Sequence, residues 1–276
     1  MIREDGVTVF YDDDFVGDRI PPQLEYAPQT EDGSPEVLPR STAYGSDEAM
    51  RMGILPFAEY APAVPPDRWK EVIEYCHTQQ IFPVYHQKRA GLMPPWDQDG
   101  YGFCWAYGLT AALMNVRERE GQARVRLSPF SLGWLTNWRN AGFFMDRAIA
   151  GARQRGIAPV EYVPEYNLRP STFKPGWEQE ALRYRPSEWW DVRTGRGAET
   201  VGECLAILSC GTPLYVGYDW WRHALTLVSL EWDERAAYKV TFVLWNSHNG
   251  GEFVRIGSAR GVPDEAYGLR ASLLTS

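Results

Sequence analysis

The sequence has little of several features that define large protein classes. Its 276 residues include 4 cysteines and 4 histidines, too few and too scattered for a disulfide framework or a recognisable zinc motif. It has no apolar run near the roughly 18 residues that a membrane span needs, and its first residues lack the basic and apolar regions of a secretory signal. We therefore expect reduced thiols, no metal, no cofactor, no membrane partner and a cytoplasmic location.

Basic residues are also scarce, and their distribution is uneven. The 28 Lys+Arg and 36 Asp+Glu residues give a net charge of −8. Residues 1–66 hold 4 basic and 13 acidic residues, so their net charge is 4 − 13 = −9. The remainder holds 24 basic and 23 acidic residues, so its net charge is +1. A nearly neutral body lacks the basic surface that phosphate backbones require, and we expect no nucleic-acid partner.

The first quarter of the chain differs from the rest in more than charge. Residues 1–66 contain 9 of the 20 prolines and none of the 12 tryptophans, and they show no sustained helical or strand period. This composition predicts an extended arm that is ordered only against a surface. Residues 67–276 are long enough to bury a core of their own. We therefore divide the chain into an acidic, proline-rich arm (1–66) and a folded domain (67–276).

Periodic patterns appear after the arm. An amphipathic helix is predicted to begin near Asp67, and a helix that is apolar nearly all round begins at or beside Cys104. Two further helices are expected over 144–155 and 200–210. Alternating patterns then predict strands at 213–218, 224–232, 238–245 and 252–256. Helices followed by antiparallel strands predict an α+β fold with two subdomains.

Cys104 has the position that a reactive thiol needs. At a helix start its sulfur faces unpaired backbone N–H groups and the positive end of the helix dipole, which lower the thiol pKa. A thiolate is a nucleophile for acyl transfer. The reaction also requires an imidazole that carries the proton, a group that orients the imidazole, and hydrogen-bond donors that stabilise the oxyanion.

The sequence around Cys104 is specific. Residues 98–107, QDGYGFCWAY, resemble the Q-x-x-x-G-x-C-W-A-[FY] motif of papain-like cysteine peptidases. Other segments that resemble the family follow in its order, and the resemblance covers roughly residues 67–257. They are Leu127–Leu132, Asn140–Gly142, Gly156–Tyr166, Cys204–Tyr218, Arg222–Ala224 and Leu244–Ser247. The strength of the resemblance lies in the order and spacing of the motifs together.

The resemblance implies a role for each matching residue. Cys104 would be the nucleophile, His223 the general base and then acid, and Asn246 the group that orients His223. The side chain of Gln98 and the backbone N–H of Cys104 would form the oxyanion hole. Substrate-binding positions would be Ala141, Gly142, Phe143 and Trp105. The implied fold has a helical subdomain that carries the cysteine helix and an antiparallel, β-barrel-like subdomain, and the implied substrate is a peptide or protein.

Other interpretations stay open. Cys104 can be a packing residue, His223 a satisfied core histidine and Asn246 the cap of a strand end. His248 stands where the family usually has tryptophan, so a second imidazole lies near the site. The resemblance is to bacterial or phage-type intracellular members without disulfides.

A second hypothesis makes the chain a structural, particle-associated or phage virion-like protein of the papain fold, with a weak or vestigial site. In that hypothesis the arm docks on a partner subunit. Alternatively, the arm lies across the cleft of its own domain.

Overall fold

A seven-stranded sheet and a buried central helix organise the described part of the chain. The computed structural model describes residues 7–17, 19–26, 30–60, 62–90, 96–248 and 252–271. The strands follow in the spatial order β2 (Ile54–Pro56), β4 (Pro186–Asp191), β9 (Glu265–Ala271), β5 (Leu214–Tyr218), β6 (His223–Trp232), β7 (Val240–Trp245) and β8 (Phe253–Ile256). Neighbouring strands are antiparallel except for the parallel pair β2 and β4. A separate parallel pair joins β1 (Val37–Leu38) to β3 (Phe143–Phe144).

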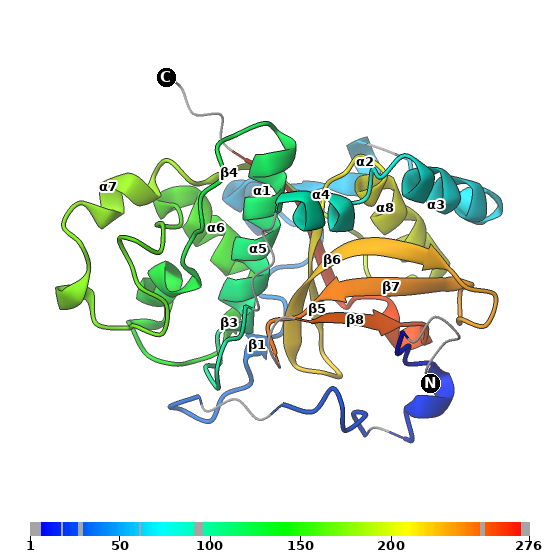
Figure 1. The fold of residues 1–276 in the computed structure, drawn as a ribbon, viewed down its shortest axis with the longest axis horizontal. Coiled ribbons are helices and arrows are strands. Elements are labelled where there is room, and N and C mark those ends of the chain that lie inside the picture. Colours follow the sequence, from blue (N-terminus) through cyan, green and yellow to red (C-terminus); the bar gives the residue numbers. More distant parts are fainter. Residues whose placement is uncertain are drawn as a thin grey trace.

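Helices cover this sheet and build the other half of the molecule. They are α1 (Asp47–Met52), α2 (Phe57–Tyr60), α3 (Trp69–Thr78), α4 (Pro83–Ala90), α5 (Cys104–Arg119), α6 (Met145–Arg155), α7 (Trp177–Ala181) and α8 (Ala198–Leu208). Short 3-10 helices lie at Asp12–Asp14, Pro66–Arg68, Pro129–Thr136, Pro170–Thr172 and Ala259–Gly261. In Figure 1, α6 and α7 lie on one side of α5, and strands β6 to β8 lie on the other. Among the described residues, none of the helices combines the length and apolar character needed to span a bilayer.

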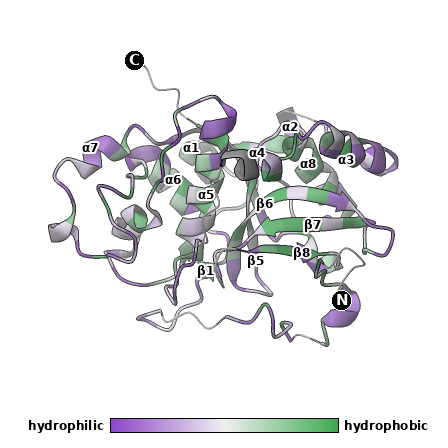
Figure 2. Ribbon diagram, viewed as in Figure 1, coloured by the Kyte–Doolittle hydropathy of each residue, from purple (hydrophilic) through white to green (hydrophobic). Residues whose placement is uncertain are grey.

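Helix α5 lies at the centre because nearly all of its surface is covered. Its residues from Cys104 to Arg117 are buried, and it packs against β5, β6 and β9 as well as α6. Gly108 permits this contact with the sheet, since a Cβ there would lie 3.0 Å from the Tyr215 ring and 3.2 Å from the Leu225 carbonyl oxygen. Figure 2 shows the same pattern in colour: β6 and β7 are mostly hydrophobic, whereas α7 is mostly hydrophilic.

The predicted α+β order is confirmed. The buried helix starts at Cys104 as expected, and α3, α6 and α8 lie where their periodicity placed them. The four predicted strands correspond to β5, β6, β7 and β8 within two residues at each end. The turn expected at 249–251 lies outside the described residues.

Residues 1–66, predicted as an extended arm, also contain short helices and strands. Ser46 caps α1 by accepting the Ala49 N–H at 3.2 Å, and Gly53 ends this helix with φ +84°. Strand β2 follows directly and pairs with β4 in the main sheet. The six-residue helix α1 and the three-residue strand β2 are too short to give a periodic pattern, so the prediction of an extended arm depended on composition alone. Figure 1 shows the earlier part of the arm running along the lower edge of the molecule toward β1.

Candidate active site

The sheet and the central helix bring the predicted cysteine, histidine and asparagine together. Cys104 is the first residue of α5, His223 is the first residue of β6, and Asn246 directly follows β7. Strands β6 and β7 are antiparallel neighbours, with Thr226 opposite Trp245. The start of one strand therefore lies beside the end of the other, and this places His223 next to Asn246.

Hydrogen bonds fix the orientation of these side chains. His223 Nε2 lies 2.7 Å from Asn246 Oδ1, which also accepts the backbone N–H of His248 at 3.1 Å. Because a backbone N–H can only donate, the Asn246 atom is the amide oxygen, and His223 Nε2 carries the proton in this bond. Cys104 Sγ accepts the backbone N–H of Ala224, the residue after His223, at 3.3 Å.

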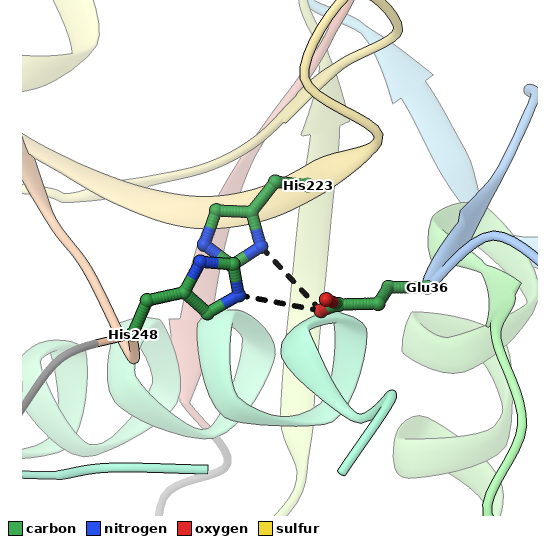
Figure 3. Close-up of side chains that lie close together, drawn as sticks. All are labelled: Glu36, His223 and His248. Carbon is green, nitrogen blue, oxygen red and sulfur yellow. Dashed lines mark hydrogen bonds and ion pairs between the residues drawn. The ribbon is translucent and has the colours of Figure 1, made fainter. Parts of the chain in front are cut away.

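A carboxylate from the arm occupies the same place. Glu36, only 3% exposed, directs Oε2 toward Gln98, His223 and His248. Gln98 Nε2 donates to it at 2.8 Å, while His223 Nδ1 and His248 Nε2 lie 3.6 and 3.5 Å away. Figure 3 shows dashed lines from both rings to this one oxygen, with the rings on the left of the view and Glu36 on the right. Burial raises the pKa of Glu36, but hydrogen bonds and charges from the two histidines outweigh burial and hold that pKa well below its usual range.

Burial, together with Glu36, gives the thiol of Cys104 a pKa opposite in direction to the one expected. We expected the helix start to lower the pKa of Cys104. Instead, burial raises that pKa well above its ordinary value, and the charge of Glu36 and a hydrogen bond to it add to the increase. A fully buried sulfur beside a carboxylate loses more from desolvation and like charge than the helix dipole returns. In the form with the arm in place, Cys104 is therefore a neutral thiol.

His248 forms the far wall of the site. Its ring stacks on His223, with ring centres 3.6 Å apart, and on Tyr26 of the arm, with ring centres 3.8 Å apart. Burial and the neighbouring His223 lower the pKa of His248 to about 4, although Glu36 opposes this change. His248 is therefore neutral near pH 7.

Hydrogen bonds fix the side chain of Gln98, the residue predicted to be an oxyanion donor. Ser247 donates its hydroxyl to Gln98 Oε1 at 2.6 Å, and the Gln98 backbone N–H donates to the Ser247 carbonyl oxygen at 2.9 Å. Its Nε2 donates to the Tyr101 carbonyl oxygen at 2.5 Å and to Glu36. The amide nitrogen is thus directed at the carboxylate of Glu36.

The predicted peptide-binding turn pairs with the arm. Phe143 donates its backbone N–H to the Glu36 carbonyl oxygen at 3.2 Å, and Gly142 donates to Ser34 Oγ at 3.3 Å. A Cβ on Gly142 would lie 1.7 Å from the Pro35 carbonyl oxygen, so only glycine permits this approach. Trp105 is fully buried and donates its indole N–H to the Ala141 carbonyl oxygen at 3.1 Å, which supports the turn from below.

Further anchors hold the arm beyond the cleft. The Ser41 and Thr42 hydroxyls and the Thr42 backbone N–H donate to the buried carboxylate of Asp146 at 2.7 to 3.0 Å. Arg40 forms an ion pair with buried Asp191. Glu36 was not predicted as a site residue, because it lies in a stretch without periodicity or motif and reaches the site only through tertiary contacts.

Comparison with known proteins identifies the fold. The sequence matches no protein-family model and no curated protein sequence. Its structure resembles the proform of the Amb a 11 cysteine protease, a ragweed pollen allergen, at 17% identity over 69% of this chain and 66% of that one, with a TM-score of 0.53. The bromelain protease of Ananas comosus matches over 67% of this chain and 96% of that one, at 16% identity and a TM-score of 0.52. The chain has a papain-like fold.

The papain-like fold is the two-subdomain α+β architecture predicted from the sequence. Digestive procathepsin L 3 of Tenebrio molitor shares it at 18% identity, with a TM-score of 0.50. That match covers 64% of this chain and 66% of the procathepsin chain. At these identities the likeness concerns the fold, and the chemistry depends on the side chains described above.

Proposed function

We propose that this chain is a papain-like cysteine peptidase whose arm closes the cleft. The observation that carries the proposal is the bond of 2.7 Å between His223 Nε2 and Asn246 Oδ1, next to a cysteine at the start of a buried helix. It sets the tautomer and the ring plane of His223 and leaves Nδ1 for proton transfer with Cys104. The four free cysteines support the proposal of a member without disulfides.

The reaction uses these groups in sequence once the arm leaves. His223 Nδ1 accepts the Cys104 proton, and the thiolate attacks the carbonyl carbon of the scissile peptide bond. The Gln98 side chain and the Cys104 backbone N–H stabilise the oxyanion. His223 then protonates the leaving amine as the C–N bond breaks. In the second half of the reaction His223 accepts a proton from water, which attacks the acyl-enzyme, and the Cys104 sulfur leaves as the acyl group is released.

The arm itself supports a peptide as substrate. Its backbone pairs with β3 through Val37 and Leu38, and Gly142 is in close contact with Pro35. This is main-chain recognition of an extended peptide at a strand edge. What the arm presents to the oxyanion donor is a carboxylate side chain, which has no amine to expel, so it fills the site and is not cut there. Its charge also opposes formation of the thiolate.

A cysteine-directed epoxide or vinyl-sulfone probe tests the proposal. We expect labelling at Cys104, no labelling in Cys104→Ala, and strongly reduced labelling in His223→Ala and Asn246→Ala. Cys210→Ala is the matched control, because it removes the exposed cysteine and leaves the cleft intact. A folded Glu36→Gln variant that also resists the probe would overturn the proposal and favour a structural role for the fold.

A further inference from the structure

The distances around Glu36 Oε2 are unusual for hydrogen bonds to imidazole. His223 Nδ1 and His248 Nε2 lie 3.6 and 3.5 Å from it, beyond the 2.7–3.2 Å of ordinary N–H···O bonds. The three ligand atoms all lie within 4.8 Å of one another. Ligand atoms bound tetrahedrally to one zinc ion at bond lengths of about 2.0–2.2 Å are separated by about 3.3–3.6 Å. The two distances to Oε2 agree with that separation.

The tautomer of His223 adds an independent argument. Asn246 Oδ1 holds the proton on Nε2, so Nδ1 of the neutral ring presents a lone pair toward the carboxylate of Glu36. Nδ1 is buried without a hydrogen-bond partner among the described residues. Two electron-rich atoms that face each other in a buried site repel each other unless a proton or a metal ion lies between them. A proton would draw Nδ1 to hydrogen-bond distance, whereas a metal ion keeps the separation seen here.

We propose that Glu36, His223 and His248 form a zinc site that clamps the arm onto the catalytic residues. Two imidazole nitrogens and one carboxylate oxygen form a ligand set that suits Zn²⁺, with water as the fourth ligand, whereas Mg²⁺ and Ca²⁺ prefer oxygen ligands alone. The carboxylate comes from the arm and the imidazoles from the body, so the ion joins the two.

The rings define the one adjustment that binding needs. His223 and His248 are stacked with 26° between their planes, and in-plane lone pairs on stacked rings do not meet at one ion. His223 is fixed by Asn246, so His248 is the ring that tilts, and the tilt changes its stacking on Tyr26. Its backbone N–H bond to Asn246 does not restrict this rotation of the side chain.

Zinc would act as a regulator of the same site. It would use the base, His223, as a ligand and hold Glu36 in the cleft, so removal of zinc would be the first step of opening. This inhibitory consequence rests on the proposed peptidase function, whereas zinc binding itself does not. Sequence spacing missed the site because its ligands come from separate segments of the chain.

Calorimetric titration of chelator-treated full-length protein with ZnCl₂ tests the site without any substrate. We expect one ion per chain with a dissociation constant below about 1 μM, and no comparable binding of Mg²⁺. His248→Phe keeps the stacked ring and removes one ligand, and Glu36→Gln removes another. Each should weaken binding by at least about tenfold. His86→Phe makes the same change in α4, away from the cluster, and should bind like the parent chain. Circular dichroism verifies that the variants fold.

The outcomes separate the two proposals. Equal zinc affinity in the parent, His248→Phe and Glu36→Gln chains, or no binding by the parent, would overturn the zinc site. Probe labelling of zinc-free protein at Cys104 would still support the peptidase in that case. Zinc binding that depends on Glu36 and His248, in a protein that no probe labels, would uphold the site and overturn the peptidase.

Discussion

Two buried glutamates, one in the arm and one in the body, have pKa values shifted in opposite directions, so one carboxyl group is ionised and the other is mostly neutral near pH 7. Glu36 lies between two imidazoles and the Gln98 amide, and these partners keep its pKa well below the usual range despite burial. Glu265, at the start of β9, accepts the Tyr267 hydroxyl at 3.0 Å. There burial raises the pKa to about 8, even though Arg40 of the arm opposes the increase.

The difference shows that burial alone does not decide whether a carboxyl group ionises. The number and charge of its partners do. Glu36 is an anion that acts on Cys104, whereas Glu265 is mostly protonated at neutral pH and serves the packing of the sheet. Glutamine keeps the shape of the side chain and removes its charge. At Glu36 this substitution should therefore weaken docking of the arm, whereas at Glu265 it should remove a pH-dependent loss of stability.

The largest effect is expected at Glu36. Glu36→Gln removes the charge that opposes the Cys104 thiolate and weakens the buried contacts that hold the arm. Loss of hydrogen bonds to a buried charge is worth about 2 kcal/mol, or about 30-fold in opening. We expect epoxide labelling of Cys104 to accelerate by about that factor. Glu25→Gln, an exposed position of the same arm, is the matched control, and equal rates for both variants would contradict the prediction.

A second effect concerns the pH dependence of stability. The pKa of Glu265 is about 8 in the folded chain against an ordinary value of 4.5, so the folded state binds more protons between these values. Its contribution to the free energy of unfolding therefore falls as pH rises from about 5 to 8, by an amount on the order of 3 kcal/mol. Glu265→Gln should flatten this slope in urea unfolding. The exposed control Glu178→Gln should leave it unchanged, and an unaltered slope in Glu265→Gln would refute the assignment.

The smallest effect is expected at the anchor beyond the cleft. Asp146 accepts three donors from Ser41 and Thr42, and Asp146→Asn weakens them without touching Glu36. A loss of about 1 kcal/mol in arm docking corresponds to about fivefold faster labelling. Labelling as fast as in Glu36→Gln would mean that anchoring, and not the carboxylate in the site, closes the cleft.

The sequence predicted the elements that local periodicity encodes. Helix α5 and strands β5 to β8 follow from apolar patterns within each segment, and the positions of Cys104, His223 and Asn246 follow from motif order. The pairings of β2 with β4 and of β4 with β9 join segments far apart in the chain, and no local pattern specifies them. Glu36 escaped prediction for the same reason, since its function depends on where the arm docks.

The pairing of β6 with β7 has a consequence for the kinetics of opening. His223 and Asn246 are spaced by the hydrogen bonds of the sheet, and the arm does not take part in that pairing. Departure of the arm therefore changes access to the site and leaves the separation of these two side chains as it is. In the proposed peptidase, the free energy of opening therefore comes from the arm contacts alone. His223 and Asn246 keep their hydrogen-bonded arrangement, so we expect no slow refolding step between release of the arm and the reaction.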